Sequence, residues 1–262
     1  MGLIGAVSNY KGGVGKTTFT VNLSAALSYK NKKILIIDND PQSDSTRAVL
    51  PHDTRIGGCL YQLIDPDETE KVNIKDCIYR TIHKNLFILP NISETSGLEI
   101  PLAKHYPQSN LYLRDAVREY VINNFDFILI DCPPTLSIFV NNALYAADFV
   151  MIPMDAGSGN SLEGIKGVLD LMDSVRNDKN PDLKFLKILI NKIDRRKSAH
   201  KAVIDDAHLR FGKENVFNNS IPTSSIFESI EYLQSKTVFS YAPKSKGAQS
   251  FRALATEFLT FF

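Results

Sequence analysis

The sequence has few cysteines and no long hydrophobic run. Its three cysteines (Cys59, Cys77 and Cys132) show no metal-binding spacing, and an odd number argues against a disulfide framework. This usage fits a reducing cytosol best. No apolar run approaches the roughly 18 residues that a membrane span requires. No charged segment followed by an apolar one precedes the first predicted strand, so we expect a cytoplasmic protein that is not exported.

The chain also lacks a strong net charge. Its 262 residues include 30 Lys and Arg and 29 Asp and Glu, which gives a formal net charge of +1. The composition as a whole therefore does not indicate nucleic-acid binding, and a solvated polar surface is the simpler interpretation of the basic segment at 194–201. The length suffices for one large α/β domain with a substantial core, and we expect residues 1–262 to form a single domain.

Short apolar runs alternate with helical patterns along the chain. The runs lack polar alternation, which is typical of strands covered on both faces. Strands are expected at 3–7, 34–38, 86–90, 127–131, 149–153 and 185–191, and helices at 17–29, 111–121, 161–176 and 250–262. This alternation predicts an α/β fold, doubly wound, with a mostly parallel sheet and helices on both faces. Residues 45–85 mix turns, charges and short helices and give the weakest signal.

A glycine-rich turn, KGGVGKTT at 11–18, lies between the first predicted strand and the first predicted helix. This context indicates a phosphate-binding loop, because glycines let the backbone approach a phosphate and the helix N-terminus presents N–H groups. Lys16 is expected to neutralise β- and γ-phosphate oxygens, and Thr17 to bind Mg²⁺. The usual pattern has a glycine at position 10, where this chain has Tyr10. The predicted nucleotide-binding residues of the loop are Lys11, Gly12, Gly13, Val14, Gly15, Lys16, Thr17 and Thr18.

Three aspartates follow predicted strands. Asp38 and Asp40 lie at the carboxyl end of the second strand, where ligands of α/β proteins bind. Because they are two residues apart on an extended segment, both side chains can face one site. We expect Asp40 to orient or deprotonate the attacking water and Asp38 to contact the Mg²⁺ shell. Asp131 ends the apolar strand 127–131 and is expected to hold Mg²⁺ through water.

The segment KGGVGKTT resembles the deviant Walker A motif of the ParA/MinD family of ATPases, which requires the early lysine and does not require glycine at the position of Tyr10. IDNDPQ (37–42) resembles the family's D-x-D-P-Q motif, although Ser43-Asp44 stand where Gly-Asn is usual. Further matches are CPPTLSIFVNNALYAADFVMIP (132–153), SLEGI (161–165) and YAPKSKGAQSFRALATE (241–257). The resemblance therefore covers nearly the whole chain and is weakest over 45–125. The nearest types are small ParA or Soj-like partition ATPases and carboxysome-positioning McdA-like ATPases.

The resemblance implies an ATPase that hydrolyses ATP weakly until a partner protein stimulates it. In the family, the early lysine reaches across a nucleotide-sandwich homodimer, so Lys11 is expected to contact the phosphates in the partner protomer. A lysine supplied in this way adds positive charge where the γ-phosphoryl oxygens become more negative, as an arginine finger does.

The base is left open by NKID (191–194), because N-K-x-D reads guanine in many GTPases. ParA relatives use an asparagine after this same strand to contact adenine, so Asn191 can serve either base. We favour ATP, with Asn191, Pro222 and Thr223 near adenine, and keep GTP as the alternative.

Three functions compete. The resemblance favours a ParA-type ATPase whose ATP-bound homodimer binds nonspecific DNA, associates with the nucleoid, and positions a plasmid, chromosome or protein organelle through a ParB-like or cargo-adaptor protein. A MinD-like membrane-cycling ATPase needs a basic amphipathic C-terminal helix, but no Lys or Arg follows Arg252, so no stable membrane anchor is expected. A metal-cluster or reductase ATPase needs further cysteines near Cys132.

Nonspecific DNA binding would depend on Lys and Arg that neutralise phosphates. A dimer doubles each basic patch. TSSIFES follows Pro222 where relatives often carry arginines, so a DNA-binding surface would be displaced from the usual place. Sequence-specific operator binding is not expected, since no helix-turn-helix precedes the loop. The candidate DNA contacts are Arg195, Arg196, Lys197, Lys201, Lys213, Lys244, Lys246 and Arg252.

Overall fold

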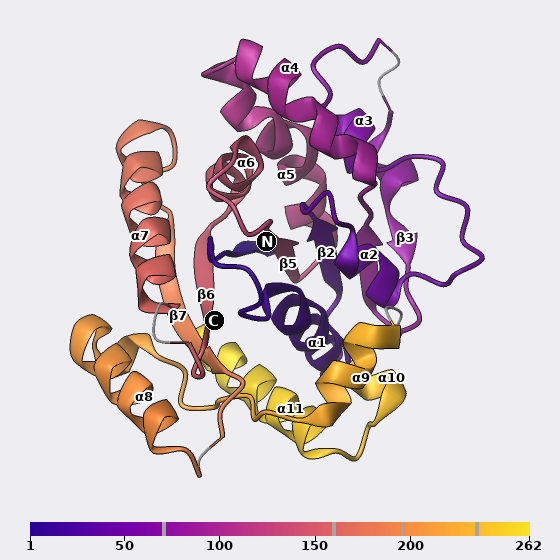
Figure 1. Ribbon diagram of the computed structural model, residues 1–262. Helices are drawn as coiled ribbons and strands as arrows, with labels where there is room; N and C mark the ends of the chain where they lie inside the picture. Colours follow the sequence, from indigo (N-terminus) through magenta and orange to yellow (C-terminus); the bar gives the residue numbers. More distant parts are fainter. Residues whose placement is uncertain (70–71, 159–160, 195, 234–235) are drawn as a thin grey trace.

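The computed structural model describes residues 1–69, 72–158, 161–194, 196–233 and 236–262. Seven strands form one sheet in the order β3-β4-β2-β5-β1-β6-β7 (Figure 1). All neighbouring strands are parallel except β3 and β4, which pair antiparallel. The strands are β1 (Leu3–Val7), β2 (Ile34–Asp38), β3 (Tyr79–Arg80), β4 (Leu86–Leu89), β5 (Phe127–Asp131), β6 (Phe149–Asp155) and β7 (Lys184–Asn191).

Helices cover both faces of the sheet, as the alternation of the sequence predicts. One face is covered by α3 (Leu60–Ile64), α4 (Glu99–Lys104), α5 (Tyr112–Asn124), α6 (Ile138–Ala146), α7 (Ser161–Asp178) and α8 (Ser198–Phe211). The other face is covered by α1 (Lys16–Ser28), α2 (Asp44–Val49), α9 (Ser225–Leu233), α10 (Val238–Tyr241) and α11 (Lys246–Phe258). In Figure 1, α3 to α6 lie above the sheet and α9 to α11 below it.

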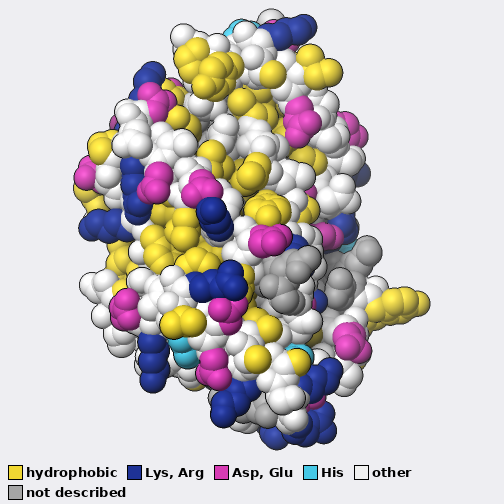
Figure 2. Space-filling view, turned by 60° about the vertical axis from the view of Figure 1, so that its left-hand side comes forward, with side chains coloured by type: hydrophobic (Ala, Val, Ile, Leu, Met, Phe, Trp, Pro, Cys, Tyr) yellow, Lys and Arg dark blue, Asp and Glu magenta, His cyan; other side chains and the backbone are white. Residues whose placement is uncertain are grey.

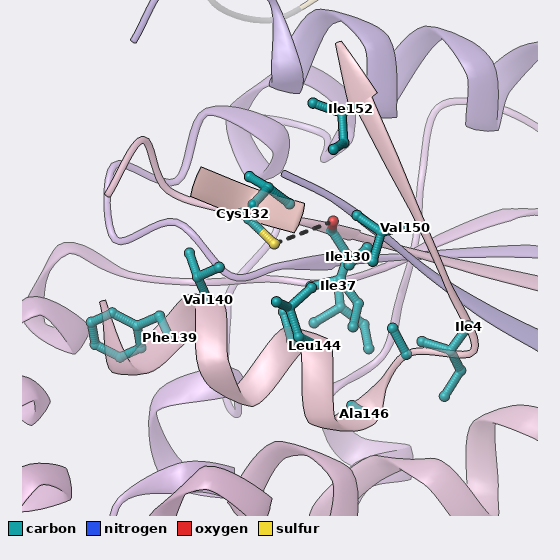
Figure 3. Packing of buried hydrophobic residues seen from close by; sticks show 14 of the residues in the cluster. Ile4, Ile37, Ile130, Cys132, Phe139, Val140, Leu144, Ala146, Val150 and Ile152 are labelled. Carbon is teal, nitrogen blue, oxygen red and sulfur yellow. Dashed lines mark hydrogen bonds between the residues drawn. The ribbon is translucent and has the colours of Figure 1, made fainter. Parts of the chain in front are cut away.

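Successive residues of the central strands point into different cores. In β2, Leu35 and Ile37 join the core under α5 and α6, whereas Ile34 and Ile36 join the core under α1 and α11. Figure 3 shows side chains of α6, among them Val140 and Leu144, close to strand residues of the first core. This two-sided burial explains the continuous apolar runs, because a parallel strand covered on both faces has no polar side.

The predicted strands and helices are confirmed, and the structure adds helices that were not predicted, namely α4, α6, α8, α9 and α10. Further differences lie in residues 45–85 and in the last helix. Residues 45–85 contain α2, α3, a 3₁₀ turn at Ile74–Cys77 and β3, and the sequence did not predict the antiparallel edge strand. The last helix begins at Lys246, capped by the Ser245 hydroxyl, rather than near residue 250. The three cysteines are free and buried. Among the described residues, no helix is long and apolar enough to cross a bilayer.

Candidate functional site

The loop between β1 and α1 has the shape of a phosphate-binding loop. Gly13 and Gly15 have φ values of 74° and 87°, in the left-handed region that favours glycine. A Cβ atom on Gly15 would lie 2.1 Å from Nδ2 of Asn191, so glycine is also required there by space. Helix α1 begins at Lys16, directly after this turn, which directs the free N–H groups of its first turn towards the loop.

The start of the loop is held by β6 and α7. Asn9 donates from Nδ2 to the Pro153 carbonyl at 2.9 Å, and its Oδ1 accepts from the backbone N–H of Lys11 at 2.9 Å. Helix α7 approaches closely here, since a Cβ on Gly164 would lie 2.1 Å from Asn9 Oδ1. Sequence reasoning missed Asn9 and Gly164. The sequence did contain a signal, because Gly164 and Gly167 lie inside a predicted helix. Glycines in a helix often allow another segment to pack closely against it.

Tyr10, which departs from the plain pattern, packs against the same helix. A Cβ on Gly167 would lie 2.8 Å from the Tyr10 ring. The position is therefore occupied by a side chain that contacts α7, and it does not need the conformational freedom of glycine.

Lys16 is buried beneath the loop. Its Nζ donates to the Lys11 carbonyl at 3.0 Å, and the residue is 7% exposed. Burial lowers the pKa of Lys16, and the negative charge of Asp131 opposes this shift. An ammonium held in this way can neutralise an anion that enters the loop.

Asp38 and Asp131 are paired across β2 and β5 and are fully buried. Thr46 donates to Asp38 Oδ2 from its backbone N and its Oγ1, at 2.7 and 2.6 Å, and Ser45 Oγ donates to Asp131 at 2.7 Å. Burial, with the charge of Asp131, raises the pKa of Asp38 to about 8. Burial also raises the pKa of Asp131 to about 6.

These carboxylates fit a hard divalent cation. Oxygen donors are what Mg²⁺ prefers, and raised carboxyl pKa values mark a place where added positive charge is favourable. Thr17 lines the adjoining cavity, so its hydroxyl and Asp131 are suitable ligands. The two oxygens of Asp38 accept from Thr46 and from the Asp40 N–H, so Asp38 lies behind the site.

A cavity of about 540 Å³ joins the loop to the second strand's carboxyl end and to the segment after β7. That volume lies in the range of small-molecule sites. Asp40 lines it, is 8% exposed and has a pKa raised by burial. The predicted site residues that line the cavity are Gly12, Gly13, Gly15, Lys16, Thr17, Thr18, Asp40, Asn191, Pro222 and Thr223. Lys11, Val14, Asp38 and Asp131 are not among its lining residues.

The asparagine and the aspartate of the N-K-x-D segment lie in different places in the structure. Asn191 lines the cavity, whereas Asp194 does not. Asp194 accepts from the guanidinium of Arg196 at 3.0 Å through both carboxylate oxygens, and this pairing lowers the pKa of Asp194 to about 2. Its backbone N–H donates to His200 Nδ1. The carboxylate that would read guanine is therefore engaged outside the cavity.

The comparisons with known proteins decide the family. Residues 2–185 match the model of the AAA domain. The chain is 34% identical to the sporulation initiation inhibitor protein Soj of Bacillus subtilis over 257 residues, which covers 98% of both chains. It is 32% identical to the chromosome partitioning protein ParA of Myxococcus xanthus, over 99% of this chain and 88% of the relative. The chain belongs to the ParA/MinD family of ATPases.

A solved structure agrees with this assignment at the level of the fold. Cobyrinic acid a,c-diamide synthase from Mycobacterium smegmatis, with bound ATP analogue and magnesium, has a TM-score of 0.82 and 28% identity. The similarity covers 99% of this chain and 95% of that chain. The expected P-loop architecture is thus confirmed over the full length of this ParA/MinD-family protein.

Lys11, the early lysine of the ParA/MinD motif, lies at the edge of the loop. Its side chain is half-buried and donates from Nζ to the Ser158 hydroxyl, in the segment after β6. Within the single chain it therefore contacts a hydroxyl of its own protomer. Its action on a second protomer stays a prediction.

The candidate DNA contacts of this ParA/MinD-family protein fall into two groups, and all those described are exposed. Arg196, Lys197, Lys201 and Lys213 surround α8, and the last two line a cavity of about 380 Å³ beside β7. Lys244 precedes α11, Lys246 is its first residue and Arg252 lies near its middle. Figure 2 shows Lys and Arg side chains gathered at the lower end of one face. Arg195 lies outside the described residues.

Proposed function

We propose that this protein binds ATP with Mg²⁺ and hydrolyses it to ADP and phosphate as the switch of a ParA-type positioning system. The observation that carries the proposal is the cavity that joins the loop glycines, Lys16 and Thr17 to Asp40. The loop N–H groups and Lys16 bind the phosphates. Asp40 accepts or orients the proton of the attacking water. Thr17 and, through water, Asp131 would hold Mg²⁺, which would neutralise charge at the phosphates.

Adenine is the proposed base because Asp194 is engaged by Arg196 away from the cavity. Asn191, Pro222 and Thr223 form the wall on that side. Side-by-side titration of ATP and GTP tests the choice. We expect ATP to bind more tightly than GTP, and tighter binding of GTP would instead indicate guanine as the base.

The proposed switch is an ATP-bound homodimer. Lys11 is half-buried at the loop edge, and its Nζ donates to the Ser158 hydroxyl, a hydrogen bond that can be exchanged for one to a phosphate of a second protomer at modest cost. Sedimentation with ATP, with ADP and without nucleotide tests this. We expect dimers with ATP alone, and Lys11→Ala to bind nucleotide yet stay monomeric and inactive. A Lys11→Ala monomer that releases phosphate would contradict the proposal.

The ATP-bound dimer is proposed to hold nonspecific DNA through the two exposed basic groups near α8 and α11. A ParB-like or cargo-adaptor protein would then stimulate hydrolysis and release, which moves a plasmid, chromosome or protein organelle. Support comes from the full-length similarity to Soj and ParA and from the exposed cations. The test is a DNA shift with ATP, ADP or neither, across a salt series. If DNA binding is absent or does not depend on ATP, the proposed DNA-binding role is wrong and a membrane-cycling role is favoured.

A further inference from the structure

Two consecutive residues, the last of β7 and the one that follows it, contact the phosphate loop. Asn191 Nδ2 donates to the Val14 carbonyl at 3.0 Å, and Lys192 Nζ donates to the Gly13 carbonyl at 2.7 Å. The amide of Asn191 is oriented by a second bond, because its Oδ1 accepts from the Lys192 N–H at 2.9 Å. The loop and residues 191–192 are thus joined by two adjacent side-chain bonds across more than half of the chain.

The turn that carries Lys192 is itself fixed by the base-side wall. Lys192 has a φ of 55°, in the left-handed region that a non-glycine residue adopts only when its surroundings hold it. Thr223 Oγ1 donates to the Lys192 carbonyl at 2.7 Å, and the Thr223 N–H donates to the Ile193 carbonyl at 2.9 Å. The position of the Lys192 side chain is therefore set by residues that also line the cavity.

These bonds act on the peptide groups that face an anion. In a trans peptide the carbonyl and the N–H of the next residue point in opposite directions. Holding the carbonyls of Gly13 and Val14 against residues 191–192 therefore directs the N–H groups of Val14 and Gly15 to the opposite side. Gly13 and Gly15 can adopt many backbone conformations, so the loop can change shape easily. Hydrogen bonds from outside the loop therefore help to select one conformation.

We propose that Lys192 and Asn191 are positioning residues that hold the phosphate loop in its anion-binding shape and couple it to the base-side wall. This inference rests on the proposed nucleotide function and deepens it. It assigns Asn191 a role on the loop in addition to the base contact expected from the sequence. Lys192, which the sequence suggested only as part of a guanine motif, lines the cavity and donates to the loop carbonyl of Gly13.

Lys192→Met tests the inference, because it keeps the stem of an exposed side chain and removes the donor. The matched control is Lys187→Met, in β7, where a half-buried lysine donates to the Glu214 carbonyl and is not among the residues that line the cavity. Dissociation constants are measured for tripolyphosphate, ATP and AMP in the presence of Mg²⁺. Lys192→Arg restores a positively charged donor at this position. Thermal unfolding of each variant shows whether the substitution destabilises the whole protein.

We expect Lys192→Met to weaken tripolyphosphate and ATP binding by roughly 10-fold and AMP binding by much less, since a charged hydrogen bond that shapes the loop acts on the phosphates it cradles. Lys187→Met should match the wild type, and Lys192→Arg should recover most of the loss. Equal weakening of all three ligands, or none, would overturn the inference. Wild-type protein that binds neither tripolyphosphate nor ATP would overturn the proposed function and this inference with it.

Discussion

Asp38 and Asp131 lie side by side at the ends of β2 and β5, in register and without solvent exposure. Burial and the negative charge of Asp131 raise the pKa of Asp38, and burial raises the pKa of Asp131. Their separate donors define separate tasks. Asp131 accepts from Thr20 of α1 and Ser45 of α2, whereas Asp38 accepts from Thr46.

Replacing Thr46 with Val should destabilise the protein. The change removes the hydroxyl that donates to Asp38 and to which the Asn91 N–H donates, and it leaves buried polar groups unsatisfied. We expect a loss of about 2 kcal/mol in the free energy of unfolding. Urea unfolding checks this, with the exposed Thr256→Val as control. A change equal to that of the control would show that the Thr46 hydroxyl contributes little.

Gly164→Ala should displace Asn9 and, with it, the backbone of Lys11. The added Cβ would lie 2.1 Å from Asn9 Oδ1 in a tightly packed place. We expect a loss of about 1–3 kcal/mol in stability together with weaker ATP binding. Gly97→Ala is the matched control, because its Cβ would meet no atom within 4 Å. Unchanged ATP affinity in Gly164→Ala would mean that the loop tolerates a shift of Asn9.

Asp40→Ala should separate binding from hydrolysis. The carboxylate lines the cavity but lies outside the loop, so we expect ATP to bind and the homodimer to persist while phosphate release falls by about 100-fold or more. Phosphate-release assays and sedimentation check this, with the exposed Asp53→Ala as control. Normal turnover in Asp40→Ala would exclude Asp40 as the residue that acts on water.

The stability of the protein should fall at mildly acidic pH through His83. Its ring is buried between Tyr29 and Thr237, with hydrogen bonds at 3.0 and 2.8 Å, and burial lowers its pKa below 6.5. The unfolded state therefore binds the proton more readily, so this contribution to stability is complete above pH 6.5 and is lost as the pH falls. The expected loss is up to about 1.4 kcal/mol per pH unit.

Urea unfolding of the wild type and His83→Gln at pH 7.5 and 5.5 isolates this effect. The difference in stability between the two proteins should shrink at the lower pH. His52→Gln, at an exposed histidine, is the control and should follow the wild type. A constant difference between wild type and His83→Gln would contradict the linkage to His83.

The two basic groups can be separated by the salt dependence of DNA binding. Lys201→Ala tests the group near α8 and Lys244→Ala the group near α11. The exposed Lys30, just after α1, provides the control Lys30→Ala. A lysine that neutralises a phosphate contributes about 1 to the slope of log K against log salt, and a dimer presents two. We expect both Lys201→Ala and Lys244→Ala to reduce the slope and the control to leave it unchanged. Equal slopes for all three would place the DNA surface elsewhere.

The sequence by itself determined the sheet, the phosphate loop and the carboxylates at the strand ends. Apolar runs without alternation report burial on both faces, and the glycines of KGGVGKTT report the backbone shape of the loop, so both can be recognised locally. The loop glycines, Lys16, Thr17 and Asp40, which line one cavity, were predicted for this reason. The antiparallel β3 was missed because two residues carry too little pattern.

Tertiary structure alone decided which of these groups meet. Asn191 and Lys192 donate to carbonyls of the loop. Gly164 leaves room for the Asn9 side chain, and Arg196 donates to the carboxylate of Asp194. Except for the last, these are contacts between residues more than a hundred positions apart. Local pattern fixes the conformation of a segment, but such contacts depend on how sheet and helices pack, and on which donor satisfies each buried acceptor.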